Sequence, residues 1–154
     1  MKQLARELES IVRKAEPKLR MIPEGVSAHK SSPGKGSAKE ILGHLIDSAS
    51  NNHQRFVRLQ ISGQLEFPDY NQQAWTQIQC YREEAWPQLI ALWQHFNLHL
   101  AHLIAITPQN NLHLSCTIGD NAPATLKGLM EDYVAHLRHH LVQIFGEDEF
   151  PAEY

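Results

Sequence analysis

Three histidines stand within five positions of one short stretch, DYVAHLRHHLVQI (132–144). His136, His139 and His140 lie among apolar residues whose spacing is that of the buried face of a helix. Imidazoles in such a place can belong to a solvated surface, to a buried hydrogen-bond network or to a metal site. The residues of this stretch do not by themselves distinguish these three interpretations.

The spacing of the histidines limits how a metal ion could be bound. Two histidines four residues apart on a helix have Cβ atoms about 5–6 Å apart, so both side chains can reach one ion at roughly 2.0–2.1 Å. The chain has two such pairs, His136/His140 and His95/His99, and His102 continues the second pair. Because His95 and His102 would lie roughly 10 Å apart along a helix axis, they cannot share an ion. Either pair therefore needs a further ligand from another helix.

A third ligand could come from an earlier segment of the chain. His44 in ILGHLID (41–47) lies at the edge of the apolar arc of a predicted helix, whereas His53 lies on the far side of that helix, where we expect it to be solvated. Helical-wheel positions do not choose between the two pairs, and a single histidine at such an edge is more often structural than a ligand. From spacing alone, a site made of His44, His136 and His140 remains one hypothesis beside the structural ones.

Four long segments with helical periodicity must position these side chains. They cover about residues 2–19, 37–61, 87–106 and 123–145, and each carries one apolar stripe. Ser37 and Glu40 form a capping box at the start of the second segment, and Gly146 is placed to end the last one. A short helix is expected at 69–75. The brief alternation in LHLSCTI (112–118) has no partner strand of similar quality, so little sheet is expected.

The pattern predicts an all-α protein, a four-helix bundle formed by a single domain over residues 1–154. Loops of ten or more residues mean that the helices need not alternate in direction. A formal net charge of −3 with scattered basic residues speaks against a phosphate-binding surface, so no nucleic-acid partner is expected. No apolar run approaches the roughly 20 residues that span a bilayer, and no signal-peptide pattern opens the chain. We therefore expect a cytoplasmic protein without a membrane partner.

Other residues near the histidines allow two interpretations each. Asp47 lies about 60° from His44 around the helix and is interpreted as a solvated or capping carboxylate. Gln143 lies one turn beyond His140, where it is either a hydrogen-bond donor to that histidine or part of the polar rim. All three tryptophans are assigned to core packing rather than to a pocket: Trp75, Trp86 and Trp93.

Three segments of the chain carry a family resemblance: SAKEILGHLIDSASNNHQRF (37–56), DYNQQAW (69–75) and DYVAHLRHHLVQI (132–144). Together they resemble the DinB/YfiT superfamily of bacterial four-helix-bundle proteins, with agreement in order and spacing over most of the chain. In that family, one histidine on the second helix and an HxxxH pair on the fourth bind a divalent metal ion. The resemblance implies that His44, His136 and His140 are the ligands, that the ion is nickel or zinc, and that the protein forms homodimers.

The resemblance also implies a function. Characterised relatives include transferases that use low-molecular-weight thiols, and others are described as metal-dependent hydrolases. Three neutral imidazoles add no charge to a divalent ion, which stays a strong Lewis acid toward a thiol or water. We therefore expect a metal-dependent S-transferase that joins a small-molecule thiol to an electrophile. The alternatives are a metal-dependent hydrolase and a non-catalytic bundle that uses the ion for binding or stability.

Metal analysis of substituted proteins separates the two histidine pairs. Replacing His95 and His99 together should leave the metal content unchanged. His136→Ala should remove the ion, because two remaining ligands bind it too weakly. The measurement is elemental analysis of protein purified without an affinity tag. If the double variant loses its metal and His136→Ala keeps it, the site lies on the helix that carries His95 and His99.

Overall fold

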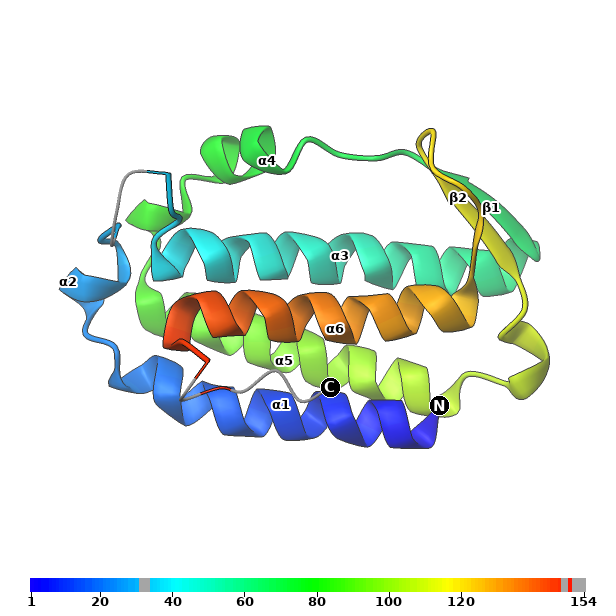
Figure 1. The fold of residues 1–154 in the computed structure, drawn as a ribbon, viewed down its shortest axis with the longest axis horizontal. Helices are drawn as coiled ribbons and strands as arrows, with labels where there is room; N and C mark the ends of the chain where they lie inside the picture. Colours follow the sequence, from blue (N-terminus) through cyan, green and yellow to red (C-terminus); the bar gives the residue numbers. More distant parts are fainter. Residues whose placement is uncertain (31–33, 148–149, 151–154) are drawn as a thin grey trace.

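The computed structural model describes residues 1–30, 34–147 and Phe150, most of them in helices (Figure 1). The body of the protein consists of four long helices: α1 (Lys2–Met21), α3 (Ala38–Ser62), α5 (Trp86–Ile106) and α6 (Leu126–Phe145). The connections contain shorter elements: α2 (Glu24–Ser27), α4 (Gln72–Gln79) and the 3-10 turns η1 (Tyr81–Glu83) and η2 (Gln109–Asn111). The four-helix bundle predicted from the sequence is confirmed.

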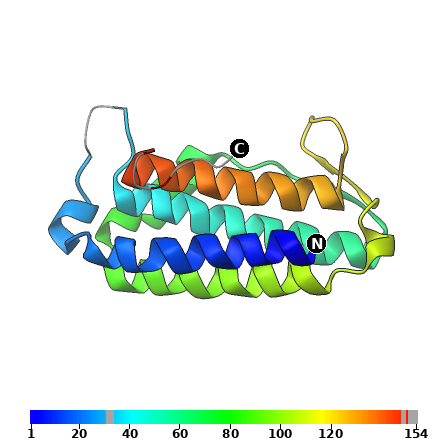
Figure 2. The ribbon, with the colours of Figure 1, turned by 60° about the horizontal axis from the view of Figure 1, so that its bottom comes forward.

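The long helices do not alternate in direction. α3 packs against α5 and α6, and α1 closes the bundle against the same two helices (Figure 2). α1 and α6 run one way, and α3 and α5 run the opposite way (Figure 1). Because α3 and α5 are parallel, residues 63–85 run back along the bundle, in contact with α3. We call this segment the crossing.

A small sheet joins the start of the crossing to the loop before α6. β1 (Gln64–Phe67) pairs in parallel with β2 (Ser115–Ile118), which pairs antiparallel with β3 (Ala124–Thr125). The alternating stretch at 112–118 therefore does contain a strand, and it has a partner that the sequence did not reveal, although the sheet is as small as expected. A partner of four residues, distant in sequence, is too short to show a period of its own.

Side chains at the ends of two long helices explain where those helices begin. At the start of α3, Ser37 Oγ accepts a hydrogen bond from the Glu40 N–H (3.3 Å) and Glu40 Oε2 accepts one from the Ser37 N–H (2.8 Å), which confirms the capping box. α6 begins later than predicted, after Pro123. Thr125 is its N-cap, and Thr125 Oγ1 accepts a hydrogen bond from the Gly128 N–H (3.1 Å).

Two further helix ends involve turn-forming residues. Gly146 ends α6 as predicted, with a positive φ of 85° and a hydrogen bond from its N–H to the Val142 carbonyl (2.7 Å). The short helix expected at 69–75 begins slightly later, as α4. Its N-cap is Asn71, whose Oδ1 accepts a hydrogen bond from the Ala74 N–H (2.9 Å).

The core lies between the long helices and is apolar. Trp93 and Tyr133 are among its largest fully buried side chains, and Trp86 is also buried, as predicted. The prediction of core packing is wrong for Trp75, which is 37 % exposed and lies against Tyr70. Trp75 belongs to α4, a helix without a buried residue, so it cannot reach the core.

α5 is unusually apolar for a helix with an exposed face. It carries no Asp, Glu, Lys or Arg. By length and composition alone α5 could cross a membrane, so the chain does contain one apolar stretch of that length, as a core helix of a bundle also can. Its inner face packs against α1 and α3. The exposed residues of its outer face include histidines and large apolar side chains: Leu92, His95, His99, His102 and Ile106.

The contact between Gly43 of α3 and Tyr81 of the crossing predicts a large effect of one methyl group. A Cβ at Gly43 would lie 2.1 Å from Tyr81 Cδ2, so Gly43→Ala must displace the tyrosine ring. We expect the free energy of unfolding to fall by about 1–3 kcal/mol, measured by urea denaturation. Gly25→Ala in α2 is the control, because its Cβ would meet nothing within 4 Å. An equal loss at both positions would contradict the packing argument.

Candidate metal centre

α3 and α6 are antiparallel neighbours, and their facing surfaces bring three histidines together. His44 lies near the start of α3, and His136 and His140 lie one turn apart on α6. The Nε2 atoms of His44 and His136 are 3.2 Å apart, and those of His136 and His140 are 3.0 Å apart. The three ligand atoms all lie within 4.8 Å of one another. We call these residues the histidine triad.

The geometry of the histidine triad fits a single cation. Two nitrogens that each lie about 2.0–2.1 Å from one ion can be at most about 4.2 Å apart, and both measured Nε2 pairs are closer than that. Hydrogen bonds among the three rings explain this arrangement less well than a bound cation does. His136 Nε2 faces two other nitrogens, and its single N–H can point directly at only one of them. A cation would satisfy all three lone pairs at once.

Gln143 sets the tautomer of His140. Its Oε1 lies 3.0 Å from His140 Nδ1, and its Nε2 lies 3.1 Å from His139 Nε2. With the amide in this orientation, His140 carries its proton on Nδ1 and directs the Nε2 lone pair toward the other two rings. Of the two interpretations of Gln143, the structure shows the hydrogen bond to His140, in which Gln143 accepts in this orientation. No described residue bonds to the buried Nδ1 atoms of His44 and His136, so nothing comparable orients those rings.

Burial favours the neutral form of all three imidazoles. His44 is only 4 % exposed; burial, and then the charges of His140 and His136, lower its pKa to about 3. Burial and His140 lower the pKa of His136 to about 4, and Asp132 opposes this shift. Burial also lowers the pKa of His140, against the effect of Gln143. At neutral pH all three residues therefore have a free lone pair, as metal ligands must.

Asp47, one turn after His44, is a buried anchor for the crossing. Its Oδ1 accepts hydrogen bonds from the Tyr81 hydroxyl (2.6 Å) and from Gln79 Nε2 (2.8 Å). Burial raises the pKa of Asp47, and these two hydrogen bonds oppose the increase. The interpretation of Asp47 as a solvated or capping carboxylate is therefore wrong. A helical wheel of α3 places Asp47 away from the core but cannot show that the crossing covers that side.

Two cavities meet at the histidine triad, and His44 and Gln72 line both of them. The first, of about 480 Å³, lies on the His140 side, and its polar lining includes Lys30, Lys35, Glu40 and Gln143. The second, of about 350 Å³, lies on the His136 side, and its polar lining includes Ser48, Asn52, Arg55, Asp69 and Asp132. Small molecules can therefore approach the histidine triad from two sides.

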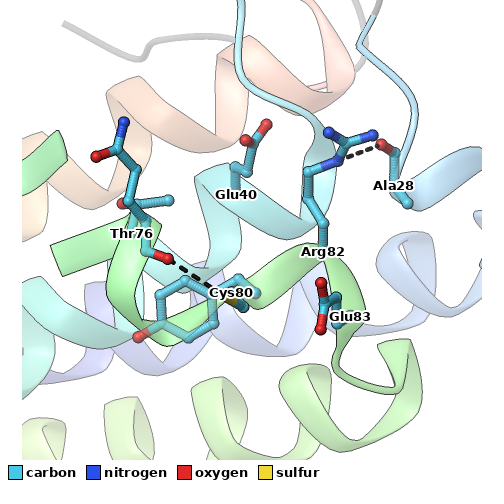
Figure 3. A pocket seen from close by; sticks show the side chains of 8 residues that line it. Ala28, Glu40, Thr76, Cys80, Arg82 and Glu83 are labelled. Atoms are coloured by element: carbon cyan, nitrogen blue, oxygen red, sulfur yellow. Dashed lines mark hydrogen bonds between the residues drawn. The ribbon is translucent and has the colours of Figure 1, made fainter. Parts of the chain in front are cut away.

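A third hollow, of about 410 Å³, lies near the end of the crossing and does not include the histidine triad (Figure 3). Arg82 closes one side of it, and its Nε donates a hydrogen bond to the Ala28 carbonyl (3.2 Å). Cys80 and Glu40 also line it. Among the residues that the structure describes, the histidine triad is the one group of three His, Cys, Asp or Glu side chains close enough to hold a metal ion.

The remaining candidate histidines lie elsewhere. His95, His99 and His102 are exposed on the outer face of α5, away from the triad. His53 is not solvated as predicted but half-buried, with its ring centroid 5.7 Å from that of Phe96 and 5.4 Å from that of His99. The wheel placed His53 on the far side of α3 correctly. It could not show that part of α5 covers that side.

Comparison with known proteins agrees with this fold. Residues 7–144 match the sequence model of the DinB superfamily. Among solved structures, the chain is similar to YfiT from Bacillus subtilis, described as a probable metal-dependent hydrolase with an unusual four-helix bundle topology. The TM-score is 0.78 at 20 % sequence identity, over 93 % of this chain and 82 % of that one, and at this identity the likeness concerns the fold alone. No curated protein matches the chain.

The lowered pKa values of His44 and His136 predict that acid destabilises the metal-free protein. A histidine in the unfolded chain has a pKa near 6.5, whereas the folded chain takes up these protons only near pH 4 and 3. Between these values the unfolded state binds more protons, so the free energy of unfolding should fall as the pH falls from about 6.5 to 4. The measurement is urea unfolding in EDTA. His44→Gln should flatten the pH dependence, and an unchanged slope would contradict the assignment.

Proposed function

Since the chain belongs to the DinB superfamily, we propose that it is a metal-dependent enzyme whose divalent ion is bound by His44, His136 and His140. One observation carries this proposal: the Nε2 atoms of the three histidines converge where two cavities meet. Imidazole nitrogens bind zinc and nickel readily. We therefore propose that the cofactor is one of these two ions.

The reaction that we propose is the transfer of a low-molecular-weight thiol to an electrophile. A divalent ion with neutral ligands and open positions lowers the pKa of a thiol that reaches it. Within the described part of the chain, no carboxylate hydrogen-bonds to the histidine triad, so no acidic side chain is held against it as a base. A thiol, with an ordinary pKa near 8.5, depends less on such a base than water does.

The two cavities suit a reaction with two substrates. A thiol in one cavity and an electrophile in the other would both lie beside the histidine triad, because His44 and His140 line the first cavity and His44 and His136 line the second. Gln143 lines the first cavity and holds His140 in the tautomer whose Nε2 lone pair faces the other two rings. Gln72, in the first turn of α4, lines both cavities and can contact either substrate.

Metal-dependent hydrolysis is the second candidate. It is favoured by the structural similarity to YfiT, which is described as a probable metal-dependent hydrolase. Asp69 and Asp132 line the cavity on the His136 side and are the carboxylates that could accept a proton from water there. Water has a far higher pKa than a thiol, so hydrolysis would depend more strongly on these residues.

A conjugation assay tests the proposed transfer. Protein loaded with zinc or nickel should accelerate the reaction of monochlorobimane with a small thiol such as cysteine, measured by the fluorescence of the product. The rate should fall to that of metal-stripped protein in His140→Gln, because one ligand is lost. His99→Gln is the matched control and should retain the rate, since His99 is exposed on α5.

The other outcomes separate the alternatives. A metal-loaded protein that gives no rate above that of metal-stripped protein, across a panel of thiols, would contradict the transferase. Ester or amide hydrolysis without a thiol, lost on Asp132→Asn, would establish the second candidate instead. Tight metal binding without either activity would identify a non-catalytic metal-binding bundle.

A further inference from the structure

Arg55 of α3 is a buried cation that pairs with no anion among the residues that the structure describes. It is only 7 % exposed, and it makes no hydrogen bond or ion pair with any residue that the structure describes. Its Nε is fully buried and unbonded. The guanidinium lies over the ring of Phe67 from β1, with Cζ 5.1 Å from the ring centroid.

This arrangement is costly for the folded protein. Burying a charge without a paired anion removes its hydration and returns little, and a cation–π contact offsets only part of the loss. Burial lowers the pKa of Arg55, while Tyr70, Cys116 and Asp69 oppose the shift from a distance. Arg55 and Asp69 are not close enough to form an ion pair. An anionic ligand beside Arg55 would offset part of this cost.

Arg55 lines the same cavity as the histidine triad. The lining of this cavity, of about 350 Å³, includes Arg55 together with His44 and His136. His44 and Arg55 are eleven residues apart on α3, which places them about 20° apart around the helix and roughly 16 Å apart along it. A single small molecule can contact both.

The other polar groups of this cavity are less suited to bind an anion. The Asn52 amide already donates to the Ser48 carbonyl (3.0 Å) and lies 3.4 Å from the Ser48 hydroxyl. Asp69 and Asp132 are exposed and repel an anion. Arg55 is thus the group in the cavity lining whose charge and free N–H donors match an oxyanion.

We propose that Arg55 binds the oxyanion, a carboxylate or a phosphate, of a small substrate whose reactive group reaches the histidine triad. This inference rests on the proposed function, because it takes the histidine triad as the reacting end of the cavity. It defines the substrate class: an acidic small molecule with the anionic group at one end and the thiol or scissile bond at the other.

Binding of matched thiols tests the proposal. The probes are 6-mercaptohexanoate and 6-mercaptohexanol, which differ in charge but have the same chain length, titrated calorimetrically into zinc-loaded protein. We expect the acid to bind about 10- to 100-fold more tightly than the alcohol, as for hydrogen bonds to a charged group. Arg55→Met, which keeps an unbranched apolar stem near Phe67, should abolish this preference. Equal affinities of wild-type protein for the two probes would overturn the proposal.

A neighbouring arginine is the control. Arg58 lies on the same helix but is exposed, and its Nε donates to Gln54 Oε1 (2.8 Å). Arg58→Met should keep the full preference for the acid, and a loss equal to that of Arg55→Met would overturn the proposal. If Arg55→Met does not fold, Arg55→Lys replaces it. Lysine keeps the charge but not the two-pronged geometry, so its preference should be intermediate.

Two further arms complete the test. Inorganic phosphate and acetate compete with the acid probe, and the stronger competitor identifies the oxyanion; failure of both to compete would overturn the proposal. The titrations are repeated on metal-stripped protein. If the protein proves unable to bind zinc or nickel and still prefers the acid probe, the role of Arg55 is supported and the proposed function is contradicted. If the protein catalyses metal-dependent conjugation but does not prefer the acid probe, the proposed function is supported and the role of Arg55 is contradicted.

Discussion

The parallel direction of α3 and α5 forces the intervening chain to travel back along the bundle, and much of the molecule follows from where that crossing lies. The crossing runs over α3. Besides the side that packs in the apolar core, α3 has another side that is polar for most of its length. The buried polar residues there include His44, Asp47, Ser48, Asn51, Asn52 and Arg55. In a simple bundle such a face would meet water. Under the crossing, each polar group must find a protein partner or a ligand.

The polar residues of α3 meet this requirement in different ways. Asp47 bonds to the crossing through Tyr81. Asn51 and Asn52 bond to carbonyls one turn earlier on α3 itself (2.9 and 3.0 Å). His44 and Arg55 keep ring or guanidinium nitrogens without a protein partner among the described residues. These two residues line one cavity with His136, and they are the residues of α3 that we propose bind the ion and the substrate.

Local patterns in the sequence predicted the features that depend on a single helix. These features include the capping box of Ser37 and Glu40 and the HxxxH pair on α6. The bundle itself was predicted in the same way, from the apolar spacing along each helix. His44 could be joined to that pair only through the family resemblance. The roles of Asp47 and Arg55 and the β1–β2 pairing depend on where the crossing lies on α3. No periodicity within residues 63–85 specifies that position, so these features required the structure.

The composition of α5 also affects how the protein behaves in solution. Its outer face exposes Leu92 and Ile106, and the helix has no permanently charged side chain. The sequence pI is about 6.3, so near this pH the molecule as a whole has little net charge, and colloidal repulsion between copies is weakest. Near this pH, little charge repulsion opposes association of molecules through the exposed apolar face of α5. Concentrated solutions should therefore aggregate least at a pH well away from the pI.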